Sequence, residues 1–362
     1  MSAMLKILTI LGTRPEIIRL SRVIDCLDKS CRHILVHTGQ NFDKQLNDIF
    51  FKELGIRRPD YNFRSRASSF AGQIGRIFCE TEKIISQVRP DKLLVLGDTN
   101  SALSAFVAKR MGVPVYHMEA GNRCYSDVVP EEVNRRLIDH SSDMLLPYTH
   151  NSRQNLLKEG LPSARIIVTG NPINEVLRYY KQNIERSKIH RNLSLDKGNY
   201  VLATFHRQEN VDIRSRLSQI MQGLKTASIF YKCPVVVSVH PRTRIRLKQF
   251  FLKKSSSSIH FLQPLGFFDF IALEKHAKMV ITDSGTVQEE CCLFGIPTVT
   301  IRDVTERPET VECGSNVLAG VNSKKMLFIL RHRLPKRGSW KAPVEYTKQN
   351  VSSDILKILK KT

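Results

Sequence analysis

The sequence predicts an α/β protein made of two Rossmann-like domains whose parallel sheets face a cleft. Short β-branched or Leu-rich runs alternate with longer stretches of helical period, a pattern typical of a parallel sheet covered by helices on both faces. The 362 residues exceed the length of one typical core, and the strand candidates are too many for one sheet. We therefore expect two sheets, with ligands at the carboxyl ends of their strands.

The first domain is predicted to span residues 1–170. Its opening strand leads into a helix over residues 15–28, where Ile17, Leu20 and Ile24 lie on one stripe. Similar alternation continues to the end of the domain. The strand candidates are residues 5–11, 33–38, 92–96, 113–118, 144–146 and 166–169.

The second domain is predicted to span residues 171–345, because turn formers at residues 170–172 end a strand candidate. A long polar helix over residues 174–191 opens it. The remaining segment, residues 346–362, contains a helix over residues 351–361 that is free to pack back on the N-terminal domain. The strand candidates are residues 200–205, 234–239, 259–262, 279–282 and 297–301.

Composition and charge limit the classes of partner. With 41% hydrophobic and 25% charged residues, the chain is not collagen-like, disordered or a disulfide scaffold. The net charge of +22 is spread along the chain and would attract anions. However, the sequence has no nucleic-acid-binding motif and no apolar run of the ~18 residues that span a bilayer, so neither nucleic-acid binding nor membrane insertion is predicted. The eight cysteines include no C-x-x-C pair, which favours a cytoplasmic location.

Arginines near the first strand end are candidates for binding a phosphate. Thr13 and Glu16 have the spacing of a capping box, so Arg14 should stand at a helix N-terminus. Backbone N–H groups and a guanidinium could receive a phosphate there. Arg19, one turn later, could face either solvent or a ligand.

Three carboxylates follow later strands of the same domain. Asp98 and Glu119 each come directly after a strand candidate, and Glu131 opens a helix. Asp98 could equally be an N-cap and Glu131 could serve a helix dipole, whereas Glu119, at the end of an apolar strand, should face the cleft. Carboxylates that converge can act as acid and base, because burial and mutual repulsion raise and separate their pKa values.

The strand ends of the second domain provide histidines and groups that could bind an anion. His206 and His240 each end a strand candidate, although either could be an ordinary core histidine. Ser284, Gly285 and Thr286 begin a helix after a strand, so their N–H and hydroxyl groups could hold a diphosphate.

Two further residues of this domain could complete a nucleotide site. Glu290 lies one turn into the same helix, where a carboxylate could hold a ribose diol. Arg307, in the following loop, would add a second positive charge. No metal site is predicted, since the chain has no H-E-x-x-H motif and no Cys/His ligand spacing.

Short motifs follow one another in a recognisable order over residues 4–330. In combination they resemble the non-hydrolysing UDP-N-acetylglucosamine 2-epimerase family. The motifs are Gly12-Thr13-Arg14-Pro15-Glu16, Gly97-Asp98-Thr99, Glu119-Ala120-Gly121, Pro130-Glu131-Glu132, Asn134-Arg135, Ser152-Arg153-Gln154-Asn155-Leu156-Leu157, Thr169-Gly170-Asn171, His206-Arg207, Glu209-Asn210, Asp283-Ser284-Gly285, Gln288-Glu289-Glu290 and Glu306-Arg307-Pro308-Glu309.

The resemblance implies a glycosyltransferase-B-like enzyme that inverts C2 of a UDP-sugar without a cofactor. In that chemistry UDP is eliminated to leave a 2-acetamidoglycal, and UDP is added back after protonation on the other face. A homodimer is a further expectation. The resemblance implies that proton transfer is carried out by Asp98, Glu119 and Glu131. It implies that the diphosphate is bound by Arg14, His206, Ser284, Gly285 and Thr286, and His206 is also counted as catalytic. It further implies that Glu290 binds the ribose, that Arg307 lies beside the phosphates, that His240 lines the cleft and that Phe270 lies at the uracil.

Departures from the UDP-GlcNAc epimerase pattern bear on the substrate. Arg19 replaces a Lys and is assigned to substrate binding, Thr286 replaces the second residue of a Gly-Gly pair, and the loop at residues 122–129 is shorter. Residues 15–22, 37–41 and 240–243 are similar to the branch that converts UDP-2-acetamido-2,6-dideoxy-L-talose to UDP-N-acetyl-L-fucosamine, which is the preferred substrate assignment. UDP-GlcNAc 2-epimerisation is the alternative, followed by a hydrolysing epimerase or a glycosyltransferase of the same fold.

Overall fold

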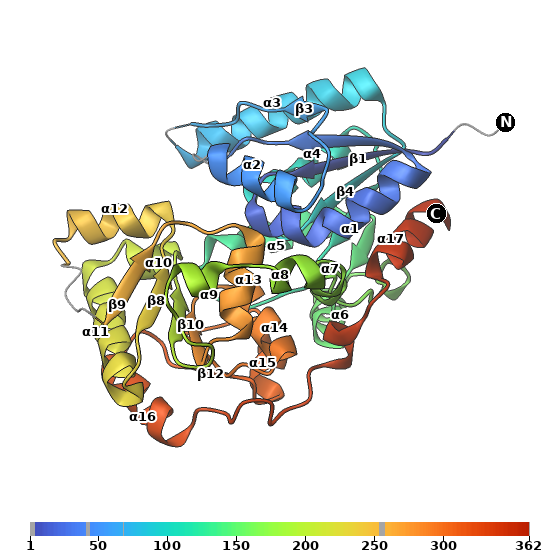
Figure 1. Cartoon of the computed structure of the whole chain (residues 1–362). Coiled ribbons are helices and arrows are strands. Elements are labelled where there is room, and N and C mark those ends of the chain that lie inside the picture. Colours follow the sequence, from blue (N-terminus) through green and yellow to red (C-terminus); the bar gives the residue numbers. More distant parts are fainter. Residues whose placement is uncertain (1–3, 41–43, 68, 253–257, 362) are drawn as a thin grey trace. The chain divides into compact units, whose positions relative to one another are not determined.

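The computed structural model in Figure 1 describes residues 4–40, 44–67, 69–252 and 258–361. The chain forms two compact units, Met1–Arg178 with Glu345–Thr362 and Tyr179–Val344. The described strands make one six-stranded sheet in each unit, and every strand pair is parallel. The predicted α/β class with two parallel sheets is therefore confirmed.

The sheet of the first unit has the order β3-β2-β1-β4-β5-β6. Leu8 and Ile10 of β1 are fully buried, because helices cover both faces of a parallel sheet. The register places Leu8 beside Ile34 on one side and Leu93 on the other. The strands are β1 (Lys6–Leu11), β2 (Arg32–His37), β3 (Tyr61–Asn62), β4 (Lys92–Leu96), β5 (Val115–Met118) and β6 (Met144–Leu146).

Helix α1 begins where the sequence predicts a helix start. Thr13 is its N-cap, Glu16 completes the capping box and Pro15 lies in the first turn. The apolar stripe that includes Ile17 and Leu20 is fully buried. The helices and 3₁₀ turns of this part of the chain are α1 (Arg14–Ser30), α2 (Lys44–Glu53), α3 (Phe70–Val88), η1 (Asn100–Leu103), α4 (Ser104–Arg110), α5 (Pro130–Ser141), α6 (His150–Lys158), η2 (Ser163–Arg165), α7 (Ile173–Tyr179), η3 (Val344–Thr347) and α17 (Val351–Lys361).

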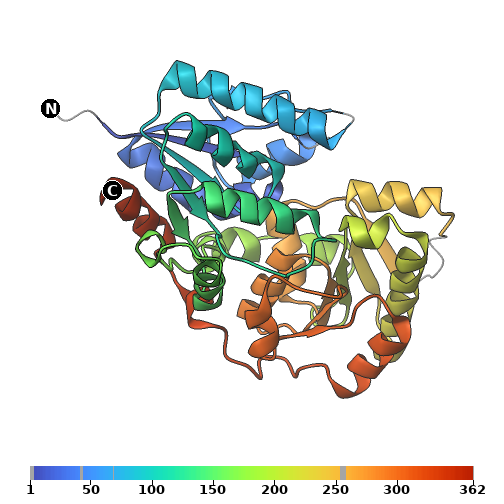
Figure 2. The ribbon, with the colours of Figure 1, turned by 180° about the vertical axis from the view of Figure 1, so that it is seen from behind.

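The last helix, α17, belongs to the first unit. It lies beside α1 in both views of the molecule (Figures 1 and 2). The buried Lys92 side chain donates from Nζ to the carbonyl oxygen of Leu359 at 2.7 Å, which satisfies one of the carbonyls that a helix C-terminus leaves unpaired. Near the other end, the backbone N–H of Ser352 donates to the Glu175 carboxylate at 2.9 Å. First-unit side chains therefore hold both ends of α17.

The second unit repeats the topology of the first. Its strand order is β12-β11-β10-β7-β8-β9. Numbered from one within this unit and read from the β9 edge, the order is 3-2-1-4-5-6, the same as in the first unit. This is the order of the Rossmann fold. Val201, Val235 and Ile281 belong to its buried core. The strands are β7 (Val201–Thr204), β8 (Val235–Ser238), β9 (Ile259–Leu262), β10 (Met279–Thr282), β11 (Thr298–Thr300) and β12 (Asn316–Leu318).

The helices of the second unit cover its sheet, and α11 packs against α16 (Figure 1). Across the described residues, no helix of either unit combines the length and apolar character that a membrane span requires. The helices are α8 (Lys181–Glu185), α9 (Ile189–Asn192), α10 (Gln208–Val211), α11 (Arg214–Tyr231), α12 (Pro241–Gln249), α13 (Phe267–Lys275), α14 (Gly285–Phe294), α15 (Pro308–Glu312) and α16 (Ser323–His332).

The strand predicted over residues 166–169 is wrong. Ile166 makes only an isolated bridge with Leu145, and its neighbour strand β6 ends before Pro147. The N–H groups of Ile167 and Thr169 donate to the carbonyl oxygens of Leu145 and Pro147, both at 2.9 Å, but Pro147 has no N–H to form the return bond, so no regular strand pairing develops. The sequence analysis also missed β3 and β12, which are two and three residues long and too short to show a strand pattern.

The single helix predicted over residues 174–191 is also wrong, because the chain forms α7, α8 and α9 instead. Tyr180 lies between α7 and α8, and its ring packs 6.4 Å and 5.6 Å from the rings of Phe267 and Phe268. Burial of this ring interrupts the helix. The units divide after Arg178 and before Glu345. The first of these boundaries lies eight residues beyond residue 170, the domain end chosen from the sequence.

Candidate active site

The turn between β1 and α1 places Arg14 at the start of a helix. Glu16 accepts hydrogen bonds from the backbone N–H groups of Gly12 and Thr13 at 3.2 and 2.8 Å. A Cβ on Gly12 would lie 2.1 Å from the Thr38 hydroxyl, so only glycine allows this close approach. The Arg14 guanidinium carbon lies 5.8 Å from the centroid of the Phe50 ring. The predicted phosphate-binding arginine is thus held on a tightly fixed turn.

Glu119 directly follows β5, and its backbone has a conformation that residues other than glycine rarely adopt. Its φ of +68° is in the left-handed region, which is uncommon outside glycine and typical of functional sites. The side chain is buried and pairs with the buried guanidinium of Arg19, and Asn122 donates to it at 3.2 Å. Arg19 also lies over the Tyr148 ring, 5.7 Å from its centroid. Arg19, assigned to substrate binding, therefore contacts Glu119.

Asp98 lies close to Glu119 and is connected to helix α5. A Cβ on Gly97, the residue before Asp98, would lie 3.8 Å from the Glu119 carboxylate. Arg135 of α5 forms an ion pair with Asp98 at 2.6 Å. Glu131 is four residues before Arg135, so the two lie on the same helix face. The structure thus places the turn that carries Asp98 next to Glu119, and connects Asp98 to α5, the helix that also carries Glu131.

A buried network lies behind these carboxylates. His117 contacts Asp139 at 2.8 Å and the Gly97 carbonyl oxygen at 2.8 Å, and Arg123 pairs with Asp139 at 2.8 Å. Burial alone would raise the pKa of Asp139, but His117 and Arg123 hold it below its usual value. The network fixes the position of Gly97.

The loop between Glu119 and Glu131 is organised by a residue that the sequence analysis did not single out. Fully buried Glu132 accepts hydrogen bonds from the backbone N–H groups of Cys124 and Tyr125, both at 3.0 Å. Arg135 donates to the same carboxylate at 2.7 Å. The Glu131-Glu132 doublet was the available signal, since neighbouring helix residues face different directions and therefore serve different roles.

In the second unit, the start of α14 lies beside Arg307. Ser284 is the N-cap, and Gly285 and Thr286 form the first turn. A Cβ on Gly285 would lie 3.0 Å from the Glu306 carboxylate and 3.5 Å from the Arg307 guanidinium carbon. The Arg307 guanidinium forms an ion pair at 2.5 Å with Glu289, which lies in α14. The structure therefore brings together the backbone donors and the arginine that were predicted to hold a diphosphate.

The two predicted histidines also lie together. The rings of His206 and His240 are 5.2 Å apart between centroids. Asp283, fully buried, accepts hydrogen bonds from the backbone N–H groups of His206 and Arg207 at 3.1 and 3.0 Å, and from Asn210 at 3.1 Å. Asp283 directly precedes Ser284, so it links the His206 turn to the start of α14.

The predicted ribose and uracil residues lie on neighbouring helices. Glu290 of α14 is buried next to Glu274 of α13. Burial, and then the charge of Glu290, raise the pKa of Glu274 well above its usual value. Phe270 precedes Glu274 by four residues and shares its helix face. Phe270 thus lies on the side of α13 that meets α14.

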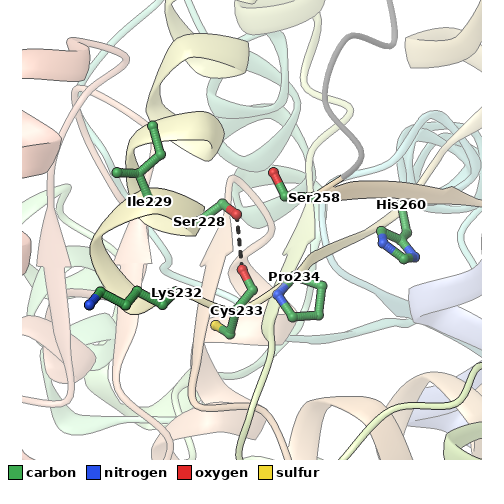
Figure 3. A pocket seen from close by; sticks show the side chains of 7 residues that line it. All are labelled: Ser228, Ile229, Lys232, Cys233, Pro234, Ser258 and His260. Atoms are coloured by element: carbon green, nitrogen blue, oxygen red, sulfur yellow. Dashed lines mark hydrogen bonds between the residues drawn. The ribbon is translucent and has the colours of Figure 1, made fainter.

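A surface pocket of about 450 Å³ lies away from these residues (Figure 3). It borders the amino ends of β8 and β9, whereas the predicted nucleotide residues follow the carboxyl ends of their strands. The Ser228 hydroxyl donates to the Cys233 carbonyl oxygen at 2.9 Å at its rim. None of the predicted site residues lines it. Among the described residues, no group of His, Cys, Asp or Glu side chains could hold a metal ion.

Two cysteines beside the α14 region give a prediction about thiol reactivity. The Sγ atoms of Cys292 and Cys313 are 3.7 Å apart. The hydrogen bond from Cys292 lowers the pKa of Cys313 to about 6 and raises that of Cys292. Because the thiolate is the nucleophile, we expect iodoacetamide at pH 7 to alkylate Cys313 before Cys292. Peptide mass spectrometry over time would check this order, with buried Cys233 as the slow reference; faster labelling of Cys292 would contradict it.

Comparisons with known proteins identify the family of the chain. The family model described as UDP-N-acetylglucosamine 2-epimerase matches residues 26–360. A UDP-N-acetylglucosamine 2-epimerase of Methanocaldococcus jannaschii is 40% identical over 348 residues, covering 94% of this chain and 95% of that protein. A UDP-2,3-diacetamido-2,3-dideoxy-D-glucuronate 2-epimerase of Pseudomonas aeruginosa is 39% identical over 337 residues, covering 92% and 93%.

A solved structure extends the agreement to the fold. The M. jannaschii UDP-GlcNAc 2-epimerase in complex with UDP-GlcNAc and UDP superposes with a TM-score of 0.94 at 39% identity, covering 99% of this chain and 100% of that chain. The sequence match and the structural match both span nearly the whole chain. The protein is therefore an epimerase of the UDP-N-acetylglucosamine 2-epimerase family.

Proposed function

We propose that the protein inverts C2 of a UDP-linked 2-acetamido sugar, with UDP-GlcNAc as the first substrate to test. The observation that supports this most directly is the Gly97-Asp98 turn next to Glu119, with Asp98 paired to Arg135 of the helix that carries Glu131. The second unit separately offers a helix N-terminus beside Arg307 that suits a diphosphate. Proton-transfer carboxylates in one unit and anion donors in the other are what this reaction requires.

The proposed reaction proceeds by elimination and re-addition. A carboxylate removes the C2 proton, the C1–O bond breaks and UDP leaves, giving the 2-acetamidoglycal. A second acid then protonates C2 on the opposite face, and a UDP oxygen re-forms the bond to C1. Glu119, which is buried and paired with Arg19, is the candidate for the base, while Asp98 and Glu131 are the candidates for the acid.

Each unit, taken by itself, has its own candidate residues for binding the nucleotide. In the first unit Arg14 is the candidate for the diphosphate, and in the second unit His206 and the Ser284–Thr286 turn are the candidates for the diphosphate. Arg307 would stabilise the negative charge that develops as UDP leaves. In the second unit, Glu290 and Phe270 remain the candidates for the ribose and the uracil, and His240 remains a candidate for the lining of the substrate site.

The choice of UDP-GlcNAc follows the names of the relatives. Two archaeal relatives, from M. jannaschii and Methanococcus maripaludis, are UDP-N-acetylglucosamine 2-epimerases at 40% and 38% identity. The P. aeruginosa relative acts on a different UDP-amino sugar at 39% identity, so similarity of this degree spans more than one substrate. UDP-2-acetamido-2,6-dideoxy-L-talose stays the second candidate, because Arg19 and Thr286 depart from the UDP-GlcNAc epimerase pattern.

The purified protein can be incubated with each UDP-sugar in deuterated water and followed by NMR. Deuterium at C2, with the C2 epimer formed, is the expected result for the true substrate. Exchange with only the deoxy sugar would identify the second candidate. Release of free amino sugar together with UDP would indicate a hydrolysing enzyme, and transfer to an acceptor without exchange at C2 would indicate a glycosyltransferase. Absence of exchange with both sugars would contradict the proposal for them.

Replacing Arg14 by Ala should mainly weaken binding of UDP. Loss of a charged hydrogen bond typically costs about 1.5 to 3 kcal/mol, or roughly 10- to 150-fold in Kd. Isothermal titration calorimetry with UDP would measure it. Arg22→Ala is the matched control, since Arg22 lies on the same helix and pairs with Asp25. Equal affinity in the Arg14 and Arg22 variants would remove Arg14 from the nucleotide site.

A further inference from the structure

Glu16 is a buried carboxyl group whose contacts exceed those of a helix cap. Its side chain is 1% exposed. One oxygen, Oε2, faces three donors: the N–H of Gly12, the N–H of Thr13 and the hydroxyl of Thr13, at 3.2, 2.8 and 2.7 Å. The other oxygen, Oε1, lies 2.5 Å from the Ser101 hydroxyl. One carboxyl group therefore contacts both the turn after β1 and the segment after β4.

The contact with Ser101 continues to the turn that carries Asp98. The hydroxyl oxygens of Ser101 and Thr99 are 2.5 Å apart, and Thr99 directly follows Asp98. Ser101 is fully buried, so water does not compete for its hydrogen bonds. Glu16, Ser101 and Thr99 thus form a continuous hydrogen-bonded chain inside the first unit.

This chain is satisfied whether or not Glu16 is ionised. In the ionised form, Ser101 donates to Oε1 and Thr99 donates to Ser101. In the neutral form, Oε1–H donates to Ser101, which then donates to Thr99, while Oε2 keeps its three donors. Burial raises the pKa of Glu16 to about 7, although Ser101, Thr13, Gly12 and Thr99 all lower it. The tie between the two turns therefore does not depend on charge.

We propose that Glu16 is a positioning residue that ties the Arg14 turn to the Asp98 turn through Ser101 and Thr99. The proposal rests on the proposed function, because Arg14 and Asp98 matter only if they meet the substrate. Glu16 itself is too deeply buried to reach a ligand. It acts by holding together two turns that cannot then move independently. One turn carries Arg14, the candidate for binding the diphosphate, and the other carries Asp98, a candidate for proton transfer. Misplacement of reacting groups by a fraction of their contact distance is costly in enzymes.

Three variants separate the hydrogen bonds of Glu16 to the Gly12-Thr13 turn from those that lead through Ser101 to Thr99. Glu16→Gln keeps its shape, since the amide oxygen can replace Oε2 and the NH₂ group can donate to Ser101. Ser101→Ala breaks only the branch to Thr99 and leaves the helix cap intact. Glu16→Ala removes both branches. Ser104→Ala is the matched control, because Ser104 is on the same segment and its buried hydroxyl makes no hydrogen bond to any of the residues that the structure describes.

We expect Ser101→Ala to lower kcat roughly tenfold while the Kd for UDP changes less than about twofold. Glu16→Ala should weaken UDP binding and turnover together, and Glu16→Gln should recover most of both. Thr99→Val combined with Ser101→Ala should add no further loss in kcat, because both changes break one chain. Ser104→Ala should behave as the unchanged protein.

Three results would overturn the proposal. Full activity in Ser101→Ala would show that the branch to Thr99 does not position the site. A loss in Glu16→Gln as large as in Glu16→Ala would show that the charge of Glu16 matters and its tie does not. Equal loss in Ser104→Ala would indicate general damage to the segment. If Glu16→Ala does not fold, Glu16→Gln and Ser101→Ala still decide the question.

Failure of the proposed function would look different. In that case the unchanged protein turns over neither UDP-sugar, and kcat cannot be compared. Calorimetry with UDP then remains as the readout for the turn that carries Arg14. Weaker UDP binding in Glu16→Ala than in Glu16→Gln would support the tie, and equal UDP affinities in the two variants would overturn it.

Discussion

Glu119→Gln is expected to lower kcat by about 100-fold or more, within the range that general acid–base catalysis contributes, while UDP still binds. The amide has nearly the same shape as the carboxylate, and its single oxygen can still accept from Arg19, although the contact with Asn122 at the other position is weakened, so the local fold should largely persist. It cannot take a proton at neutral pH, and the proton-transfer step should fail. Steady-state kinetics and deuterium exchange at C2 would measure the loss.

The control for this variant is Glu82→Gln, which removes a carboxylate from the exposed surface of α3. It should leave kcat unchanged. Calorimetry with UDP separates the two possible roles of Glu119. If Glu119→Gln loses UDP affinity by the same factor as kcat, Glu119 supports the structure of the site and is not the group that moves the proton.

Asp283→Ala is expected to destabilise the second unit by about 3 kcal/mol or more, because it leaves buried donors without an acceptor and each costs about 1 to 3 kcal/mol. The N–H groups of His206 and Arg207 lose their partner, and Asn210 loses one of two. The turn that carries His206 should move away from α14, so UDP affinity should also fall. Urea unfolding and calorimetry would measure the two effects.

Asp283→Asn gives a graded test of the same contact. Its remaining oxygen can accept from part of the donor set, so it should be damaged less than Asp283→Ala. Asp196→Asn, at an exposed position of the second unit, is the matched control and should resemble the unchanged protein. Unaltered stability in Asp283→Ala would mean that these hydrogen bonds do not hold the His206 turn.

Strands whose apolar runs are bounded by clear turn residues could be predicted to the residue. Strands β4, β6, β9 and β10 have the bounds expected from the sequence. Residues 166–169 have similar β-branched composition, yet they form no strand, because the neighbouring strand stops at Pro147. The helix expected over residues 174–191 failed for a related reason, since burial of Tyr180 outweighs the local period. Tertiary context therefore decided both differences.

The candidate site could be predicted where a residue's place at a strand end defines it. Arg14, Glu119 and Ser284 were found in this way, and their roles stay predictions until they are tested. The partners that orient them could not be found, because Arg135 pairs with Asp98 and Ser101 with Glu16 across long stretches of sequence. Pairing of this kind depends on the fold and leaves no local pattern.

The position of α17 affects the order in which the protein can fold during synthesis. The second unit is one continuous stretch, Tyr179–Val344, and can close on itself as soon as that stretch has left the ribosome. The first unit begins earlier but finishes later, since Lys92 and Glu175 must wait for the helix that binds them. The half translated first is thus the half completed last, and until then the α1 surface that receives α17 stays open to water and to other chains.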